Sequence, residues 1–238
     1  MAYLNGGRIV LDGLVLALDA GDKNSYPGSG TTWRDYSGNG NNGTLTNGPS
    51  FSSGNGGKIN FDSTDDYVNI PYNSSQNLTS QGTLSVWINP STLTQSWYAG
   101  LISQSTGGST NAQAYQLSWR QVSGALFGSI CNGSGTYNDI FAPLPTVANV
   151  WYNIVFTWNG SLATMYNNGV QIGQIAQTIN CQVLTTDLTI GGYTYKGAGG
   201  GAEYFNGAIA NAFVYNRGLT AIEILQNYNA TKTRFNLI

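Results

Sequence analysis

Carboxylates are the side chains of this sequence that could carry acid–base or metal chemistry, because the chain contains no histidine. Histidine is the one side chain whose unperturbed pKa lies close to neutrality. Three aspartates, Asp62, Asp65 and Asp66, fall close together, and Asp35 stands in a segment rich in Asn and Gly. Clustered carboxylate oxygens suit Ca²⁺, and a carboxylate pair suits hydrolysis of a glycosidic bond. Asp35, Asp65 and Asp66 are therefore the candidate ligands of a calcium ion.

A structural role in a turn is the alternative for Asp65 and Asp66. Both precede a predicted strand at residues 67–70, and an aspartate in a turn commonly accepts hydrogen bonds from the nearby backbone. The two glutamates stand apart, Glu203 near a glycine-rich segment and Glu223 in a predicted helix cap. The sequence therefore requires no cofactor, and it leaves calcium binding open.

Aromatic side chains are the other candidate functional groups, with 15 tyrosines and 6 tryptophans in a chain whose charged fraction is only 8%. Six of them flank loops rich in Gly, Ser and Asn: Trp97, Tyr98, Tyr137, Tyr193, Tyr195 and Tyr204. Such rings can stack on sugars or anchor a partner protein, since Tyr and Trp dominate contact energy. Alternatively, they pack against their own loops and keep a polar end in water. We predict a contact surface at these six residues, beside the glycine-rich residues 197–201.

The charge balance argues against nucleic acid and membrane partners. The net charge is −2, from 9 basic and 11 acidic residues, so the chain has no strongly basic surface to attract nucleic acid or anionic lipid. The longest aliphatic run, residues 14–18, is far shorter than the ~20 residues that span a bilayer. The first twelve residues carry Asn5, Gly6, Gly7 and Arg8 in place of the apolar segment of a signal peptide. We expect no signal peptide, and a protein that stays in the compartment where it is made.

Two cysteines, Cys131 and Cys181, leave their pairing open. A disulfide between them would close a long loop and contribute roughly 4 kcal/mol in the chain-entropy model. In a reducing compartment they stay thiols, and we expect two unpaired, partly buried thiols. A metal site at either cysteine is not indicated, because neither has a second cysteine or a histidine nearby.

The elements that must position these groups are short strands separated by Gly, Asn and Pro. The twelve predicted strands span residues 14–19, 58–61, 67–70, 84–88, 101–103, 115–119, 125–130, 151–158, 162–166, 170–175, 188–190 and 208–215. Asn167-Asn168-Gly169 predicts a tight hairpin, because Asn and Gly tolerate a positive φ. The pattern predicts an all-β fold, a two-sheet antiparallel jelly-roll sandwich. Five aromatic residues at strand positions are predicted to lie in its core: Trp87, Trp151, Phe156, Trp158 and Phe213.

A short C-terminal helix follows the last predicted strand. Thr220 and Glu223 form a capping box, in which each side chain satisfies a free backbone N–H at the helix start. Ile222, Leu225 and Tyr228 give an apolar stripe that is predicted to dock on the sandwich. We expect one domain over residues 14–238, preceded by an N-terminal arm, residues 1–13, which is a second candidate contact region.

Several segments resemble the laminin-G-like, concanavalin A-like jelly-roll family. They are residues 14–21 (LVLALDAG), 35–44 (DYSGNGNNGT) and 61–68 (FDSTDDYV), with 205–209 (FNGAI) and 214–220 (VYNRGLT) near the end. The likeness covers roughly residues 14–235 and implies the jelly-roll fold. It implies less about function, because the family includes lectins, adhesion modules and viral structural proteins.

Residues 26–44 and 222–229 are most similar to single-domain versions encoded by tailed bacteriophages. That resemblance implies a virion component, used for capsid decoration, in the neck or as a tail appendage, and made in the host cytoplasm. Its partners would be other virion proteins, and it would be an oligomer on the particle. The alternative is a lectin-like carbohydrate-binding module that binds a host or environmental polysaccharide.

The family also bears on catalysis and calcium. Glycosidases of this fold place acidic residues alternately on one strand, and no Glu-x-Asp-x-Glu-like segment occurs here. Related domains that bind calcium use an acidic residue just after the Gly-x-Ile of the last strand, where this chain has Ala210 and Asn211. We therefore predict a non-catalytic protein that acts through surface contacts.

Overall fold

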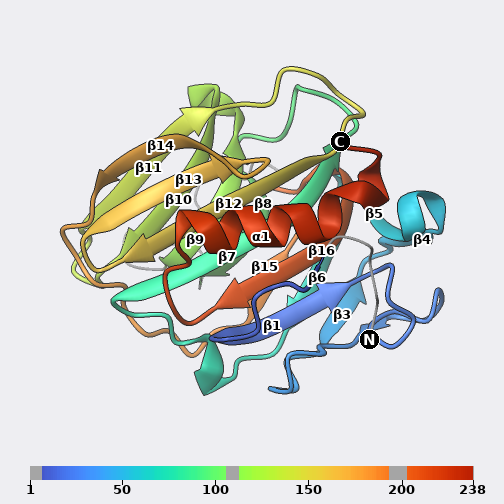
Figure 1. The fold of residues 1–238 in the computed structure, drawn as a ribbon, viewed down its shortest axis with the longest axis horizontal. Coiled ribbons are helices and arrows are strands. Elements are labelled where there is room, and N and C mark those ends of the chain that lie inside the picture. The colour runs from blue at the N-terminus through green and yellow to red at the C-terminus, as the bar shows by residue number, and fades with distance from the viewer. Residues whose placement is uncertain (1–6, 106–112, 193–202, 238) are drawn as a thin grey trace.

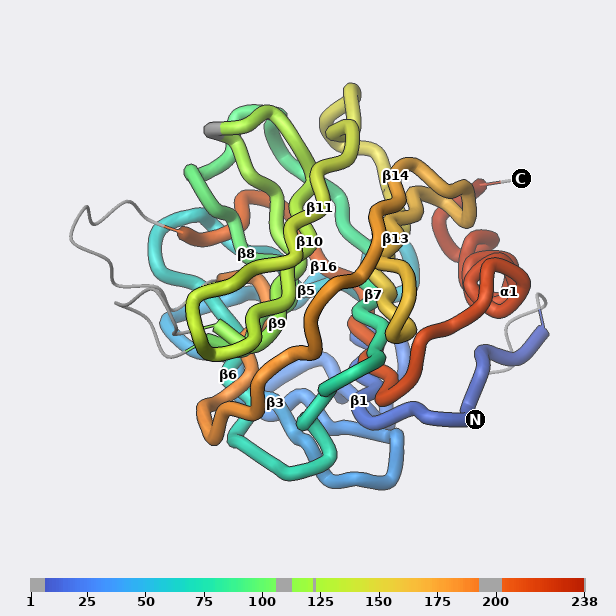
Figure 2. Tube along the Cα trace, turned by 90° about the vertical axis from the view of Figure 1, so that its left-hand side faces the viewer, coloured from blue at the N-terminus to red at the C-terminus, as the bar shows by residue number. Residues whose placement is uncertain are grey.

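The computed structural model describes residues 7–105, 113–192 and 203–237, and it confirms the predicted all-β sandwich with one C-terminal α-helix. Two antiparallel sheets, A and B, pack face to face. Figure 1 shows α1 (Ala221–Thr231) lying across the outside of the fold. The turned view in Figure 2 gives the order of the layers as sheet B, sheet A and then α1.

Sheet A carries the C-terminal strand in its middle. Its order is β14 (Val170–Ala176), β13 (Leu162–Asn167), β12 (Tyr152–Asn159), β7 (Gln81–Pro90), β16 (Asn206–Tyr215), β5 (Lys58–Asp62) and β4 (Ser50–Ser52). The long strand β16 has two partners on one side. The β5 strand pairs with its first half, and β1 (Leu14–Asp19) pairs with its second half.

Sheet B forms the opposite layer. Its order is β11 (Tyr137–Pro143), β10 (Ala125–Cys131), β9 (Gln113–Arg120), β8 (Ala99–Ser105), β15 (Leu188–Ile190), β6 (Tyr67–Ile70), β3 (Gly43–Thr46) and β2 (Thr32–Trp33). Among the described strands, β2, β3, β4 and β11 were not predicted. The β2, β3 and β4 strands are only two to four residues long, and Asn138 and Asp139 in β11 are poor strand formers.

The core lies between the sheets, where alternate residues of both layers meet. It includes Phe156 and Trp158 of β12, as predicted. Trp87, Trp151 and Phe213 are also buried, but on the outer face of sheet A, where Trp87 and Trp151 pack against Phe235. Val155 of β12 belongs to the cluster on the outer face, so β12 is covered on both faces, which explains its nearly continuous run of apolar residues.

The predicted tight turn between β13 and β14 is confirmed. Asn168 has φ 51° and Gly169 φ 77°, so both central residues adopt the left-handed conformation that a two-residue hairpin requires. Cys131 and Cys181 are free and buried, as the unpaired alternative predicts. Burial raises the pKa of the Cys181 thiol to about 12.

The capping box of α1 is confirmed, and the predicted docking stripe is correct for Tyr228, whose ring stacks on Trp87 with centroids 5.7 Å apart, but wrong for Ile222 and Leu225. The Thr220 hydroxyl accepts from the Glu223 N–H at 3.3 Å, and the Glu223 carboxylate accepts from the Thr220 N–H at 2.9 Å. Ile222 is 80% exposed and Leu225 46% exposed. The buried side chains of the helix are Ile224, Asn227, Ala230 and Thr231.

Hydrogen bonds to sheet A explain which face of α1 is buried. The Trp87 indole Nε1 donates to the Thr231 hydroxyl at 2.8 Å, and Asn227 donates to the Tyr215 hydroxyl at 3.0 Å. Buried polar groups need such partners. The helix therefore buries Asn227 and Thr231, and the side chains of Ile222 and Leu225 remain exposed.

The described part of the predicted arm packs against α1. The Val10 N–H donates to Asn227 Oδ1 at 2.8 Å, and the Val10 carbonyl accepts from the Tyr215 hydroxyl at 3.0 Å. Gln226 donates to the Arg8 carbonyl at 2.9 Å. Residues 7–13 thus contribute to the helix-bearing side of the molecule, whereas residues 1–6 lie outside the described residues.

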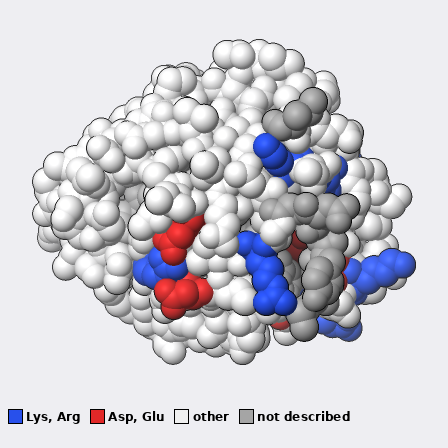
Figure 3. Space-filling model, viewed as in Figure 1, with Lys and Arg blue, Asp and Glu red and all other residues white. Residues whose placement is uncertain are grey.

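Charged side chains are sparse on this side. Figure 3 shows them gathered in a few groups, with an uncharged surface over β12 to β14. No helix in the described part of the chain is long and apolar enough to cross a membrane.

Candidate functional site

The outer faces of the two sheets differ in what covers them. The α-helix and residues 7–13 cover sheet A, whereas no α-helix of the described residues lies on sheet B. In the middle of the outer face of sheet B the small polar side chains are nevertheless buried, and they pair with one another. The hydroxyl oxygens of Ser103 and Thr189 lie 2.9 Å apart, and the Ser129 hydroxyl donates to the Asp139 carboxylate at 2.6 Å. The accessible groups lie along strand β11 and the loop before β8.

Four side chains form a cluster at one end of this face, and we call them the aromatic patch. Phe127 of β10 and Phe141 of β11 are paired across the strands with ring centroids 5.2 Å apart. The Arg120 guanidinium carbon lies 4.9 Å from the Phe127 centroid and 5.4 Å from that of Phe141. It lies 4.7 Å from the Tyr98 centroid, and Nη2 donates to the Tyr98 hydroxyl at 2.7 Å.

Strand register explains how these residues meet. Phe127 stands opposite Phe141 on β11 and opposite Ser118 on β9. Arg120 is two residues beyond Ser118 and therefore shares its face, at a diagonal distance that a long side chain can span. The three strands thus bring the cation and two rings to one point.

No Asp or Glu side chain pairs with Arg120. All eleven Asp and Glu residues belong to the described residues, and none forms an ion pair with this guanidinium. Its Nε is buried without a hydrogen-bond partner in the described part of the chain. The buried Nε–H is out of reach of a ligand, but the Nη groups keep N–H donors beyond the one bonded to Tyr98, and these can bond a ligand oxygen. The rings provide flat apolar contact.

Three of the six predicted contact residues lie at this patch or beside it. Tyr98 is a member, Trp97 precedes it and is 66% exposed, and Tyr137 is 38% exposed. Tyr137 shares the outward face of β11 with Phe141, which is 49% exposed. These exposed rings extend the apolar contact area along the edge of sheet B.

Tyr204 is not part of the patch. It is half-buried, with its ring centroid 6.4 Å from that of Tyr67, and its carbonyl accepts from the Ser96 hydroxyl at 2.8 Å. Burial raises the pKa of Tyr204. The predicted contact residues Tyr193 and Tyr195 lie outside the described residues.

The loop that carries Trp97 and Tyr98 is fixed by Gln95. The buried carboxamide of Gln95 donates to the Asn206 carbonyl at 2.9 Å and accepts from the Asn206 N–H at 2.8 Å. The Gln95 N–H donates to the Gln121 carboxamide at 3.1 Å. The loop is therefore tied to two other segments, so Trp97 and Tyr98 need little ordering when a ligand binds.

The candidate calcium ligands fall in two separate places. Asp65 and Asp66 lie with Asp62, their carboxylate oxygens within 4.8 Å of one another. Asp66 is buried and accepts from the Asp62 N–H at 3.0 Å, while Asp62 accepts from the Thr64 N–H at 2.8 Å. Asp66 therefore bonds the backbone of the turn between β5 and β6, as the structural alternative expects of it, and Asp62 does so as well, whereas no such bond is found for the Asp65 carboxylate among the described residues.

Asp35 organises its own loop instead. Its carboxylate accepts from the backbone N–H groups of Ala17, Ser37 and Asn41 at 2.8, 2.9 and 2.9 Å, and from the Ser37 hydroxyl at 2.8 Å. Four donors account for its acceptor positions. Calcium binding at Asp65 and Asp66 stays a prediction, and Asp35 does not belong to their carboxylate cluster.

Glu203 is the one acidic residue with a strongly raised pKa outside an ion pair. Burial raises that pKa to about 8, and one carboxyl oxygen is buried without a hydrogen-bond partner among the described residues. Burial is the cause of the shift, and no second carboxylate contributes to it. Glycosidases require two carboxyl groups that act together on one bond.

Three members of the patch, Arg120, Phe127 and Phe141, were not predicted as site residues. One signal was available for Phe141. In residues 137–143 the buried positions Asn138, Ile140 and Ala142 alternate with exposed ones, the pattern of an edge strand with one face in solvent. The convergence of Arg120 on two phenylalanines depends on register between strands, which local sequence does not show.

Comparisons with known proteins agree with the observed architecture and give its family. The chain belongs to the concanavalin A-like lectin/glucanases superfamily, because a laminin-G model of that family matches residues 62–225. No curated protein matches the sequence.

Solved structures share the fold at low sequence identity. Domain 4 of the extracellular arabinanase AbnA from Geobacillus stearothermophilus, in complex with arabinotriose, has a TM-score of 0.66 and 16% identity, covering 90% of this chain and 98% of that one. The binding domain of Paraclostridial Mosquitocidal Protein 1 has a TM-score of 0.69 and 19% identity, covering 92% and 52%. The binding domain of Botulinum Neurotoxin DC, in complex with SialylT, has a TM-score of 0.67 and 16% identity, covering 93% and 52%. The chain thus spans about half the length of these two toxin domains.

Proposed function

We propose that this protein is a non-catalytic, lectin-like module that binds glycans at the aromatic patch. The observation that carries the proposal is an arginine without a carboxylate partner, stacked on three rings at the accessible edge of sheet B. Family membership and the glycan complexes of two structural neighbours support it.

The patch offers two kinds of contact to a sugar. The exposed rings of Phe141 and Trp97 provide flat surfaces for the apolar C–H face of a pyranose or furanose. Arg120 donates hydrogen bonds to ring hydroxyls or to a carboxylate, and such charge-assisted bonds contribute about 1.5–3 kcal/mol each. A shallow patch of this size predicts affinities in the micromolar to millimolar range, about −8 to −4 kcal/mol.

The distribution of carboxylates supports a binding role. Asp139, the acidic residue on the outward face of β11, accepts from Ser129. Glu203 has a pKa raised by burial alone. Neither has a second carboxylate positioned with it as a catalytic pair, so bound sugar would be held without cleavage.

A glycan array followed by calorimetry tests the proposal. Wild-type protein should bind a defined set of oligosaccharides, and Phe141→Ser should weaken the tightest binding at least tenfold, or about 1.4 kcal/mol. Val170→Ser is the matched control, because Val170 is also an exposed apolar strand residue but lies on β14. Equal binding by Phe141→Ser and the control would refute the proposed site.

A structural role on a bacteriophage particle is the second candidate, and it rests on the sequence resemblance. Exposed apolar side chains on the helix-bearing side, Ile222, Leu225 and Val170, favour contacts with other proteins such as virion partners. Leu225 lies beside the Gly169 turn that precedes Val170, so the three belong to one region. Mass spectrometry of purified bacteriophage particles tests this role. Particles that lack the chain would refute it.

A further inference from the structure

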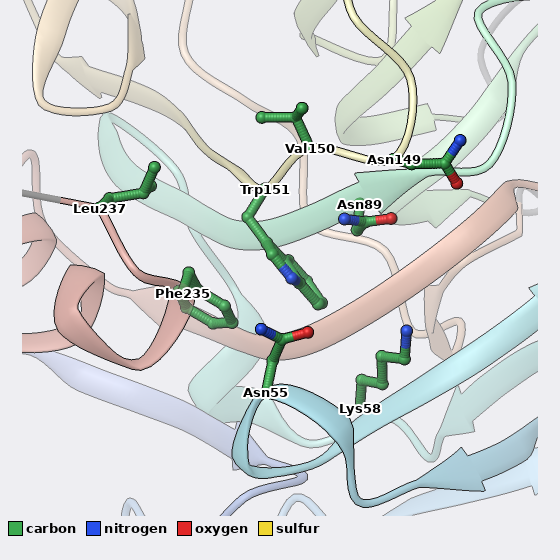
Figure 4. A pocket seen from close by; sticks show the side chains of 8 residues that line it. All are labelled: Asn55, Lys58, Asn89, Asn149, Val150, Trp151, Phe235 and Leu237. Atoms are coloured by element: carbon green, nitrogen blue, oxygen red, sulfur yellow. The ribbon is translucent and has the colours of Figure 1, made fainter.

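A pocket of about 420 Å³ opens on the helix-bearing side of the molecule, on the opposite sheet from the aromatic patch. Figure 4 shows its eight lining residues: Asn55, Lys58, Asn89, Asn149, Val150, Trp151, Phe235 and Leu237. Lys58 begins β5, Asn89 lies near the end of β7, and Phe235 ends the short helix η4 (Lys232–Phe235) after α1. The volume falls in the range of ~300–1,000 Å³ that small-molecule sites occupy.

The polar groups of the pocket are not used by the fold. The carboxamides of Asn55, Asn89 and Asn149 make no hydrogen bond with the described residues, and none of these groups is buried. Among the described residues, which include all eleven Asp and Glu side chains, Lys58 has no ion-pair partner. In Figure 4 the Lys58 ammonium points toward the side of the pocket that holds Asn89 and Asn149.

The apolar wall is rigid. The rings of Trp151 and Phe235 pack with centroids 4.5 Å apart, and Phe235 also packs against Trp87 at 4.2 Å. Trp151 is buried except at the pocket, and its indole Nε1 has no hydrogen-bond partner among the described residues. The indole can therefore offer both an apolar edge and a donor to a ligand.

The backbone on two sides of the pocket is fixed before any ligand arrives. Asn149 has φ 60°, and its N–H donates to the Pro90 carbonyl at 2.7 Å. Asn55 has φ 51°, and its carbonyl accepts from Arg234 Nε at 2.8 Å. Little reorganisation is needed on binding, which reduces its entropic cost.

We propose that this pocket is a second ligand site and binds a sugar unit that carries one carboxylate, a uronic acid. Three carboxamides both donate and accept, which matches the hydroxyls of a sugar ring. Trp151 supplies an apolar edge and an indole donor, and the single ammonium of Lys58 matches a single negative charge. None of the described residues that line the pocket is acidic, so none of them repels that charge.

D-glucuronic acid and D-glucose test this site, because they differ only in whether C6 is a carboxylate. Titration of ¹⁵N-labelled protein followed by NMR should show wild type binding glucuronic acid more tightly than glucose. Lys58→Gln should weaken glucuronic acid binding about tenfold and leave glucose binding unchanged, since it removes a charge-assisted bond. Asn89→Ala should weaken the binding of both sugars.

Two controls separate this site from the aromatic patch. Lys23→Gln removes the same charge from an exposed lysine that does not line the pocket, and Phe141→Ser removes the patch ring. Lys23→Gln should bind glucuronic acid like wild type. In Phe141→Ser the NMR shift changes at the pocket residues Lys58 and Asn89 should saturate at the same glucuronic acid concentration as in wild type, whether or not the patch binds the sugar. Wild-type protein that does not bind glucuronic acid would overturn the proposal, as would equal affinities of Lys58→Gln and Lys23→Gln.

Discussion

The stability of the fold should fall as pH rises from about 5 to 9, because of Glu203. Burial raises the pKa of this carboxyl to about 8 in the folded protein, against an ordinary value of 4.5. Between these two values the folded state holds a proton that the unfolded state has lost, so a rise in pH favours unfolding. The difference sets an upper limit of about 5 kcal/mol, at about 1.4 kcal/mol per pH unit.

Denaturant unfolding of wild type and Glu203→Gln at pH 5, 7 and 9 measures this effect. The carboxamide is uncharged at every pH, so the variant should have nearly the same free energy of unfolding as wild type at pH 5. At pH 9 it should be more stable by several kcal/mol. If the difference in unfolding free energy between wild type and Glu203→Gln does not change with pH, the Glu203 carboxyl is not buried without a partner, and the reasoning is refuted.

The same titration tests whether Glu203 has a carboxylate partner. Burial alone raises its pKa, so Asp65→Asn should leave the pH midpoint of the stability change where it is in wild type. A midpoint that falls toward 4.5 in Asp65→Asn would show that two carboxylates act on each other. That outcome would reopen the possibility of glycosidase chemistry.

Three other predictions concern the ion pairs and the loop of the patch. A hydrogen bond from Arg217, with a smaller contribution from Thr220, lowers the pKa of Glu223 to about 2, so its stabilisation is present above pH 4.5 and is lost as pH falls toward 2. Acid titration of Glu223→Gln should lack this transition, worth about 1 kcal/mol for a partly exposed pair, and an unchanged profile would contradict it. Arg234→Met should cost about 3–5 kcal/mol in denaturant unfolding, because Asp19 then stays buried without its partner, whereas a cost below 1 kcal/mol would show that water reaches Asp19. Gln95→Ala should weaken glycan binding several-fold in calorimetry with a smaller effect on unfolding, and unaltered affinity would show that the loop needs no anchor.

Local patterns of the sequence predict most of the strands. The boundaries of β1, β6 and β15 agree with the prediction residue for residue, because each is a short run of mostly apolar residues between turn-forming residues. The capping box at Thr220 and the turn at Gly169 also depend only on neighbouring residues. These features are encoded within a few positions of one another.

Features that depend on distant partners were predicted less well. The exposed face of α1 differs from the expected one, because Thr231 and Asn227 form hydrogen bonds with side chains of strands β7 and β16. Arg120 and Phe141 are 21 positions apart and meet only through the register of β9, β10 and β11. Trp97 and Tyr137 could be proposed from composition alone, but the cation between the rings could not.

A crystal structure of the protein with its tightest-binding array oligosaccharide tests the central claim most directly. The account predicts a sugar ring against Phe141 or Trp97, with one of its oxygens within hydrogen-bond distance of Arg120. Sugar density elsewhere on the molecule, with the aromatic patch unoccupied at saturating ligand, would contradict it.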